Sequence, residues 1–235
     1  MRRALAAILS TLLPCGAAPA IVGQADEAVP LFVRHTLKVI IPKGACSAVV
    51  VGPQLAMTAA HCVVGASSVK IAGTQTGLIE AAKIVSHPHF ANRANDAADI
   101  ALLKTAKVLP GTVLPAMLGA RPVRTGETLI AVGYGLQDGG KRDGSARMAA
   151  LAVAQIFANS FTLADPVALG ERPKRGACGG DSGAPVFSSQ GGSLFLVGII
   201  SGSDNCGGTT LVISLAPYRN WIEQTSRQLD AQLGP

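Results

Sequence analysis

The chain has 235 residues, of which 49% are hydrophobic, 14% are charged and 27 are glycine. Disordered chains are poor in aliphatic residues and rich in charge, so this composition excludes intrinsic disorder. No apolar run reaches the roughly 18 residues of a membrane-spanning helix. The net charge of +6 is spread along the chain without a dense basic face, so we expect no nucleic-acid partner.

The first twenty residues have the pattern of an export signal. Two arginines follow Met1, an apolar run covers Ala4–Leu13, and an A-x-A sequence ends at Ala20. This order is typical of a cleaved signal peptide, and the apolar run is too short for a permanent anchor. We therefore expect a signal peptide over 1–20, a protein domain over 21–235, a secreted or periplasmic location, and no membrane association after cleavage. A buried N-terminal helix is the alternative.

The cysteine count fits this interpretation. The chain has five cysteines, and cleavage after Ala20 would remove Cys15. The four that remain, Cys46, Cys62, Cys178 and Cys206, form an even set, which suits two disulfides in an exported protein.

Short β-type runs separated by glycine and proline turns follow along the chain. They are 35–41, 47–51, 69–72, 78–85, 100–103, 128–132, 147–154, 194–200 and 209–215. Regular short strands without intervening helices predict an antiparallel sandwich or barrel. Prolines and glycines gather over 107–125, where we expect a boundary between two strand-rich halves. Apolar residues at helical spacing over Pro217–Leu229 predict a C-terminal helix.

Three segments carry residue types of nucleophilic catalysis: Thr58–Cys62, Asp99–Leu103 and Gly179–Pro185. Ser182 lies among glycines, which allow a tight turn with backbone N–H groups converging on a developing oxyanion. The neutral imidazole of His61 could take the serine proton, and the carboxylate of Asp99 could fix the imidazole tautomer. Asp96 is an alternative for the carboxylate, but only Asp99 precedes an apolar run that can form a buried strand.

Thr58–Cys62, Asp99–Leu103 and Gly180–Pro185, in this order, resemble the signature segments of the chymotrypsin/trypsin-like serine proteases, and the pattern suggests a secreted, bacterial-type member. Ile21–Gln24 resembles the mature N-terminus of that family, and Gly133–Gly135 resembles its Gly-Trp-Gly turn. The similarity extends over 21–235. It implies an all-β fold of two six-stranded antiparallel β-barrels with a C-terminal α-helix. It also implies that Cys46 pairs with Cys62, and Cys178 with Cys206.

The resemblance assigns catalytic roles to individual residues. Ser182 would be the nucleophile, His61 the general base and then acid, and Asp99 the group that orients His61. The N–H groups of Gly180 and Ser182 would form the oxyanion hole. The implied activity is that of a serine endopeptidase acting through an acyl-enzyme.

The resemblance also indicates the substrate pocket. Its expected residues are Gly176, Ala177, Ser201, Gly202, Ser203 and Thr210. An aspartate at the position of Gly176 would select Lys or Arg, so its absence predicts cleavage after uncharged, small or medium apolar residues. Thr210 is expected to narrow the cavity. Asp204 could still supply a charge and restore a basic preference.

The family's activation mechanism implies a pairing of the Ile21 amino group with Asp181. Signal cleavage after Ala20 would itself free that amine, so we expect export to produce the active enzyme directly. Cleavage after Ala18, followed by removal of a dipeptide, is the alternative.

Other functions remain open at this point. A protease homologue that binds partners without catalysis is the main alternative, and a hydrolase of another fold is the second. His87 and His89 could suggest a metal site, but a surface turn explains them better. The sequence has no metal motif, phosphate loop or cofactor fingerprint, so we expect no metal and no cofactor. The expected partners are protein or peptide substrates and a protein inhibitor, and the protein is expected to be a monomer.

Overall fold

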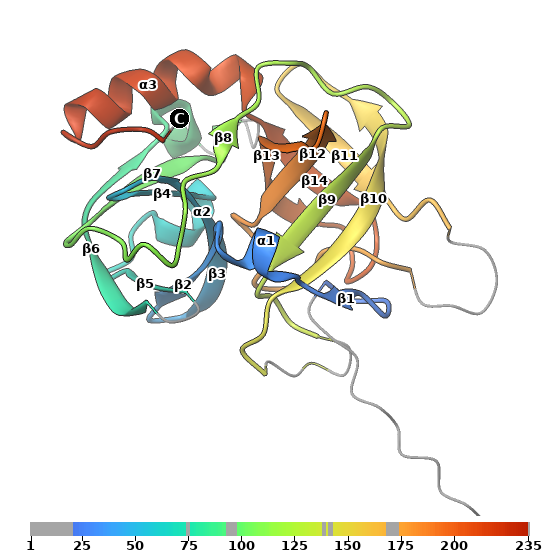
Figure 1. Ribbon diagram of the computed structural model, residues 1–235, viewed down its shortest axis with the longest axis horizontal. Coiled ribbons are helices and arrows are strands. Elements are labelled where there is room, and N and C mark those ends of the chain that lie inside the picture. Colours follow the sequence, from blue (N-terminus) through green and yellow to red (C-terminus); the bar gives the residue numbers. More distant parts are fainter. Residues whose placement is uncertain are drawn as a thin grey trace, which may run out of the picture.

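The computed structural model describes residues 21–73, 76–92, 98–137, 140, 143–167 and 174–234. Two β-sheet lobes lie side by side, with β2–β7 in one and β9–β14 in the other (Figure 1). The predicted signal peptide, 1–20, and the alternative carboxylate, Asp96, lie outside the described residues.

The first lobe is a closed, antiparallel six-stranded barrel of order β2-β3-β4-β7-β6-β5. Its strands are β2 (Thr36–Ile41), β3 (Gly44–Gly52), β4 (Leu55–Thr58), β5 (Lys70–Gly73), β6 (Gly77–Ser86) and β7 (Ala101–Thr105). Alternate residues of β2, Leu37 and Val39, point into the barrel and belong to its buried cluster, as the two-residue period of a strand requires.

The second lobe closes through six antiparallel strands, because β9 pairs with both β10 and β12 at the ends of the series β10-β11-β14-β13-β12. These strands are β9 (Thr128–Gly133), β10 (Arg147–Ile156), β11 (Ser160–Ala164), β12 (Pro185–Gln190), β13 (Ser193–Ser203) and β14 (Thr210–Ser214). Two short strands add to this sheet: β1 (Asp26–Glu27) pairs with β10, and β8 (Met117–Leu118) pairs with β13. The predicted pair of six-stranded barrels is thus confirmed.

A third apolar cluster joins the lobes. In β3, Ala48 and Val50 face the interior of the first barrel, whereas Val49 and Val51 face the cluster between the barrels. Phe187 from β12 and Leu196 from β13 reach the same cluster from the second barrel. Strands buried on both faces need continuous apolar sequence, which accounts for the aliphatic, charge-poor composition.

Helices are few and short in the described part of the chain. They are α1 (Pro30–Val33), α2 (Ala60–Val63), the 3-10 turns η1 (Pro88–Asn92) and η4 (Ala216–Tyr218), and α3 (Arg219–Gln228). The predicted C-terminal helix is confirmed as η4 followed by α3, which lies over the first barrel (Figure 1). None of the helices in the described ranges is long and apolar enough to cross a membrane.

Five strands of the structure were not predicted from the sequence: the two-residue strands β1 and β8, and the barrel strands β4, β11 and β12. The first four residues of β12 and all four of β4 are buried, so neither segment shows the polar alternation that marks a half-buried strand. Strand β12 also follows directly on the glycine-rich Gly179–Pro185 segment, which reads as a loop.

His87 helps to attach α3 to the first barrel. Its ring is 8% exposed and lies against Tyr218 and Trp221, with centroid distances of 5.1 and 4.9 Å. The His89 ring packs edge to face with it, at a centroid distance of 5.1 Å. Burial lowers the pKa of His87, and the proximity of His89 lowers it further. The predicted surface turn is therefore also an aromatic contact between elements.

This contact predicts a pH dependence of stability. Because the folded state favours neutral His87, the unfolded state binds more protons once the pH falls below the ordinary histidine pKa of about 6.5. The free energy of unfolding should therefore fall as the pH is lowered through this range, and less steeply in a His87→Phe variant. Urea unfolding followed by the fluorescence of Trp221, the single tryptophan, measures both slopes. Burial also lowers the pKa of His35, so a residual slope is expected, but equal slopes would contradict the role of His87.

Candidate active site

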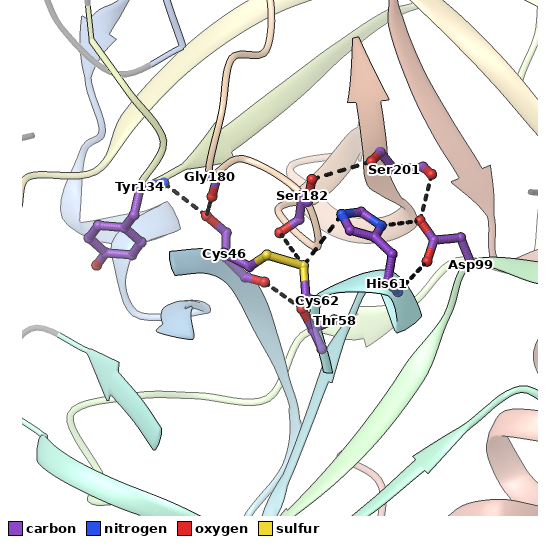
Figure 2. Close-up of a disulfide and its surroundings, with 10 residues drawn as sticks. Cys46, Thr58, His61, Cys62, Asp99, Tyr134, Gly180, Ser182 and Ser201 are labelled. Atoms are coloured by element: carbon purple, nitrogen blue, oxygen red, sulfur yellow. Dashed lines mark hydrogen bonds and ion pairs between the residues drawn. A yellow bond between two sulfur atoms is a disulfide. The ribbon is translucent and has the colours of Figure 1, made fainter. Parts of the chain in front are cut away.

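The three residues assigned to catalysis come from both lobes and meet where the lobes join (Figure 2). His61 lies in α2, directly after β4, and Asp99 lies just before β7, both in the first lobe. Ser182 lies in the loop that precedes β12 in the second lobe. The contact between the lobes therefore determines how Ser182 faces His61.

Asp99 and His61 form a close pair. The His61 Nδ1 atom is 2.7 Å from Asp99 Oδ2, and the His61 backbone N–H donates to Asp99 Oδ1 at 2.9 Å. The Asp99 side chain is 3% exposed, whereas that of His61 is 41% exposed. A carboxylate at Nδ1 favours the tautomer with its proton there, which leaves Nε2 free of a proton and able to accept one.

Ser201 forms hydrogen bonds with both Asp99 and Ser182. Its hydroxyl donates to Asp99 Oδ2 at 2.6 Å, and its carbonyl oxygen accepts a hydrogen bond from Ser182 Oγ at 3.3 Å. Figure 2 shows Ser182 beside the Nε2 edge of the His61 ring. The sequence placed Ser201 only in the substrate pocket, and nothing local to Ser201 signals its contact with Asp99.

The loop around Ser182 depends on glycine and on contacts with the first lobe. Gly183 has φ +82°, and a Cβ atom there would overlap the Ser47 carbonyl oxygen and the Thr58 hydroxyl. The Ser182 carbonyl oxygen accepts a hydrogen bond from Ser47 N–H at 2.8 Å. A side chain at Gly183 would thus push the serine loop away from β3 and β4.

The three residues before Ser182 each accept a hydrogen bond at the backbone carbonyl oxygen. Gly179 O accepts from Leu136 N–H at 2.7 Å, and Gly180 O accepts from the Ser47 hydroxyl at 3.0 Å. Asp181 O accepts from Ala184 N–H at 2.9 Å. The bonds to Gly179 O and Asp181 O fix the peptide planes that carry the N–H groups of Gly180 and Ser182, the predicted oxyanion-hole donors, and the bond to Gly180 O fixes the plane between them.

Asp181 is a fully buried carboxylate in the second lobe. Its Oδ1 accepts from Gly135 N–H at 2.8 Å, and its Oδ2 accepts from Cys178 N–H at 3.0 Å. Cβ atoms at Gly133 or Gly135 would overlap this carboxylate, so the Gly-Tyr-Gly turn is shaped around it.

The N-terminal segment lies in the same region. Ile21 is fully buried in the apolar cluster of the second barrel. The next residue, Val22, exchanges backbone hydrogen bonds with Gly176, at 3.0 and 3.4 Å. The segment is thereby joined to the residue predicted to form the pocket floor.

The predicted pocket residues are connected to one another. Thr210 is fully buried, and its hydroxyl accepts from Ala177 N–H at 3.0 Å, while Ser203 Oγ donates to Ala177 O at 3.0 Å. A Cβ atom at Gly176 would be 2.7 Å from Gly208 O.

A cavity of about 430 Å³ beside this network is lined by Ser201, Gly202, Ser203, Asp204, Thr209 and Leu211. Asp204 itself is exposed, and its carboxylate accepts from Asn205 N–H at 2.9 Å.

Both implied disulfides are present, Cys46–Cys62 beside His61 and Cys178–Cys206 beside the serine loop. The sulfur of Cys62 is 3.7 Å from His61 Nε2, but its bond to Cys46 leaves no thiolate to bind a metal. The rings of His87 and His89 pack edge to face, as in a packing cluster.

Comparisons with known proteins place this geometry in a family. The Trypsin family model matches residues 21–222. Mouse vitamin K-dependent protein C is 27% identical over 214 residues, which are 77% of this chain and 46% of that protein. Human kallikrein-4 is 26% identical over 201 residues, 77% of each chain. The chain spans about half the length of the protein C relatives that it matches.

A solved structure supports the same fold. Neuropsin, a serine protease from mouse brain, superimposes with a TM-score of 0.72 at 20% identity, covering 87% of this chain and 99% of neuropsin. These relatives are animal proteins, so the expected bacterial type has no support. The match over nearly the whole described chain shows that the protein belongs to the trypsin family of serine proteases.

Proposed function

We propose that this protein is a serine endopeptidase that uses Ser182, His61 and Asp99. The observation that carries the proposal is the hydrogen-bonded His61–Asp99 pair beside Ser182 at the junction of two barrels. Rotation about the Ser182 Cα–Cβ bond would turn its hydroxyl away from Ser201 O and toward His61 Nε2. A hydrolase of the α/β fold is excluded by the two-barrel architecture.

The reaction follows from these positions. As Ser182 Oγ attacks the substrate carbonyl carbon, His61 Nε2 takes the hydroxyl proton, and the carbonyl oxygen becomes an oxyanion. The N–H groups of Gly180 and Ser182 stabilise this oxyanion. His61 then gives its proton to the leaving amine, and a water molecule activated by His61 hydrolyses the acyl-enzyme.

The second part of the proposal concerns activation. We propose that the fully buried Asp181 carboxylate forms an ion pair with the amino group freed by cleavage before Ile21, because Ile21 is itself fully buried in the same lobe and the family resemblance implies this pairing. The backbone of Ile21 has φ +45°, a region that costs a β-branched residue about 1–3 kcal/mol. A free N-terminal residue has no φ angle, so cleavage removes that cost. Export through a signal peptide over 1–20 would supply the cleavage.

The third part concerns the substrate. Thr210 and Ala177 bond to each other, and the close packing of Gly176 against Gly208 leaves no room for a charged side chain at that position. These contacts support cleavage after uncharged, small or medium apolar residues. Protein or peptide substrates, a protein inhibitor and a monomeric state complete the proposal.

A Ser182→Ala variant tests the catalytic assignment. We expect kcat for peptide hydrolysis to fall by about 10⁴-fold or more, because the nucleophile is lost while the fold is kept. An organophosphonate should transfer its phosphonyl group to Ser182 of the unsubstituted enzyme, with loss of its leaving group, and the mass of that phosphonyl group should be absent from the variant. A folded protein that neither hydrolyses peptides nor reacts with the phosphonate would instead support the non-catalytic binding protein.

The N-terminus of the exported protein tests activation. We expect N-terminal sequencing to begin at Ile21, and a version with one additional residue before Ile21 to lose most of its kcat/KM, since the amine no longer reaches Asp181. Thermal unfolding serves as the control for folding of the extended version. Full activity with the additional residue in place would refute the pairing.

A panel of peptide p-nitroanilides tests specificity. Substrates ending in Ala or Val should be cleaved with kcat/KM values at least about tenfold above those ending in Arg or Lys, because no carboxylate neutralises the base at the pocket floor. Preference for Arg that disappears in Asp204→Ala would show instead that Asp204 sets the specificity.

A further inference from the structure

Ser47 is a polar residue in an otherwise apolar stretch of β3, and it is fully buried. The proposed reaction does not use it, and its position after Cys46 suggested nothing in the sequence. A buried hydroxyl in such a strand is costly unless it is hydrogen-bonded, so its partners indicate what it does.

The hydroxyl of Ser47 has partners in two different segments of the second lobe. It donates to Gly180 O at 3.0 Å and accepts from Tyr134 N–H at 3.0 Å. The backbone N–H of the same residue donates to Ser182 O at 2.8 Å. One residue of the first barrel thus holds the serine loop and the turn that follows β9.

The Ser47 hydroxyl acts on the peptide group between Gly180 and Asp181, which lies between the two peptide groups that carry the proposed oxyanion-hole donors. Gly180 has φ +99° and no side chain, so the peptide groups on its two sides can rotate more freely than those beside other residue types. Leu136 N–H donates to Gly179 O, in the peptide group before Gly180. The Ser47 hydroxyl donates to Gly180 O, in the peptide group after Gly180. Because Ser47 also bonds Tyr134, two residues before Leu136, one hydroxyl connects both restraints.

We propose that Ser47 is a positioning residue that fixes the oxyanion-hole N–H groups through the carbonyl of Gly180. This inference rests on the proposed peptidase function. It is specific to a side chain, since a backbone N–H alone at this position would hold Ser182 O but not Gly180 O. Without the hydroxyl, the peptide planes on either side of Gly180 rotate more freely, and the donors are less well preorganised for the transition state.

A Ser47→Ala variant tests the inference. We expect kcat to fall about tenfold with KM nearly unchanged, a smaller loss than the roughly 10²–10³-fold that follows removal of a donor itself. A peptidyl trifluoromethyl ketone labelled with ¹³C at its carbonyl supplies a direct signal. The hemiketal oxygen that it forms on Ser182 should ionise about one pH unit higher in the variant, because its stabilising donors are less well aligned.

Two further variants separate positioning from general stability. Ser188 is also buried, and its hydroxyl donates a hydrogen bond to Glu127 at 2.9 Å. It lies in the second lobe but outside the proposed catalytic machinery. Ser188→Ala should lower the melting temperature without changing kcat or the hemiketal ionisation. Ser47→Thr, which keeps the hydroxyl, should restore kcat. If Ser47→Ala does not fold, Ser47→Gly removes the same hydroxyl without adding bulk and should give the same shifts.

The possible results are distinct. Failure of the unsubstituted enzyme to react with the phosphonate refutes the proposed function and the inference with it. Normal reaction combined with an unchanged kcat and hemiketal ionisation in Ser47→Ala refutes the inference alone. An equal loss in Ser188→Ala shows that Ser47 acts only through stability.

Discussion

The site depends on one constraint, the fixed position of the two barrels relative to each other. His61 and Asp99 belong to the first barrel and Ser182 to the second, so no local sequence can place all three. The hydrogen bond from Ser47 N–H to Ser182 O joins the lobes at the serine itself. Around it, an apolar cluster with Val49, Phe187 and Ile199 resists any sliding of one lobe over the other, because sliding would break well-packed contacts.

Two buried carboxylates show how the protein keeps charge inside such an apolar junction. Asp99 receives hydrogen bonds from the backbone and ring of His61 and from Ser201. Asp181 receives them from the backbone of Gly135 and Cys178. Each carboxylate needs close approach of its donors, which is why the main chain around Asp181 is glycine. Gly133 and Gly135 leave the space that this buried charge needs, whereas glycines such as Gly44 and Gly126 have open space around them and serve turns.

Membership of the trypsin family sets the fold and the general chemistry, whereas the departures from the family pattern give this chain its own character. In the proposed substrate pocket, Gly176 lies where an aspartate would select Lys or Arg, and the buried Thr210 hydroxyl accepts a hydrogen bond from Ala177 N–H. Ser47 adds a side-chain hydrogen bond at the junction of the lobes, close to the reacting serine. Specificity and preorganisation can thus vary while the residues proposed for catalysis stay the same.

The sequence alone determined the β class, the order of most strands, the C-terminal helix and the segments around His61, Asp99 and Ser182, because these depend on local periodicity and on short motifs. The tertiary structure decided which distant residues meet. Ser201 reaches Asp99 across 102 positions and Ser47 reaches Gly180 across 133, and no local pattern marks either contact. Only the tertiary structure identified β4 and β12 as strands, because their burial on both faces removes the alternation of polar and apolar residues by which a strand is recognised. Local propensity identifies elements and motifs, whereas burial and hydrogen-bond satisfaction across the two lobes form the site.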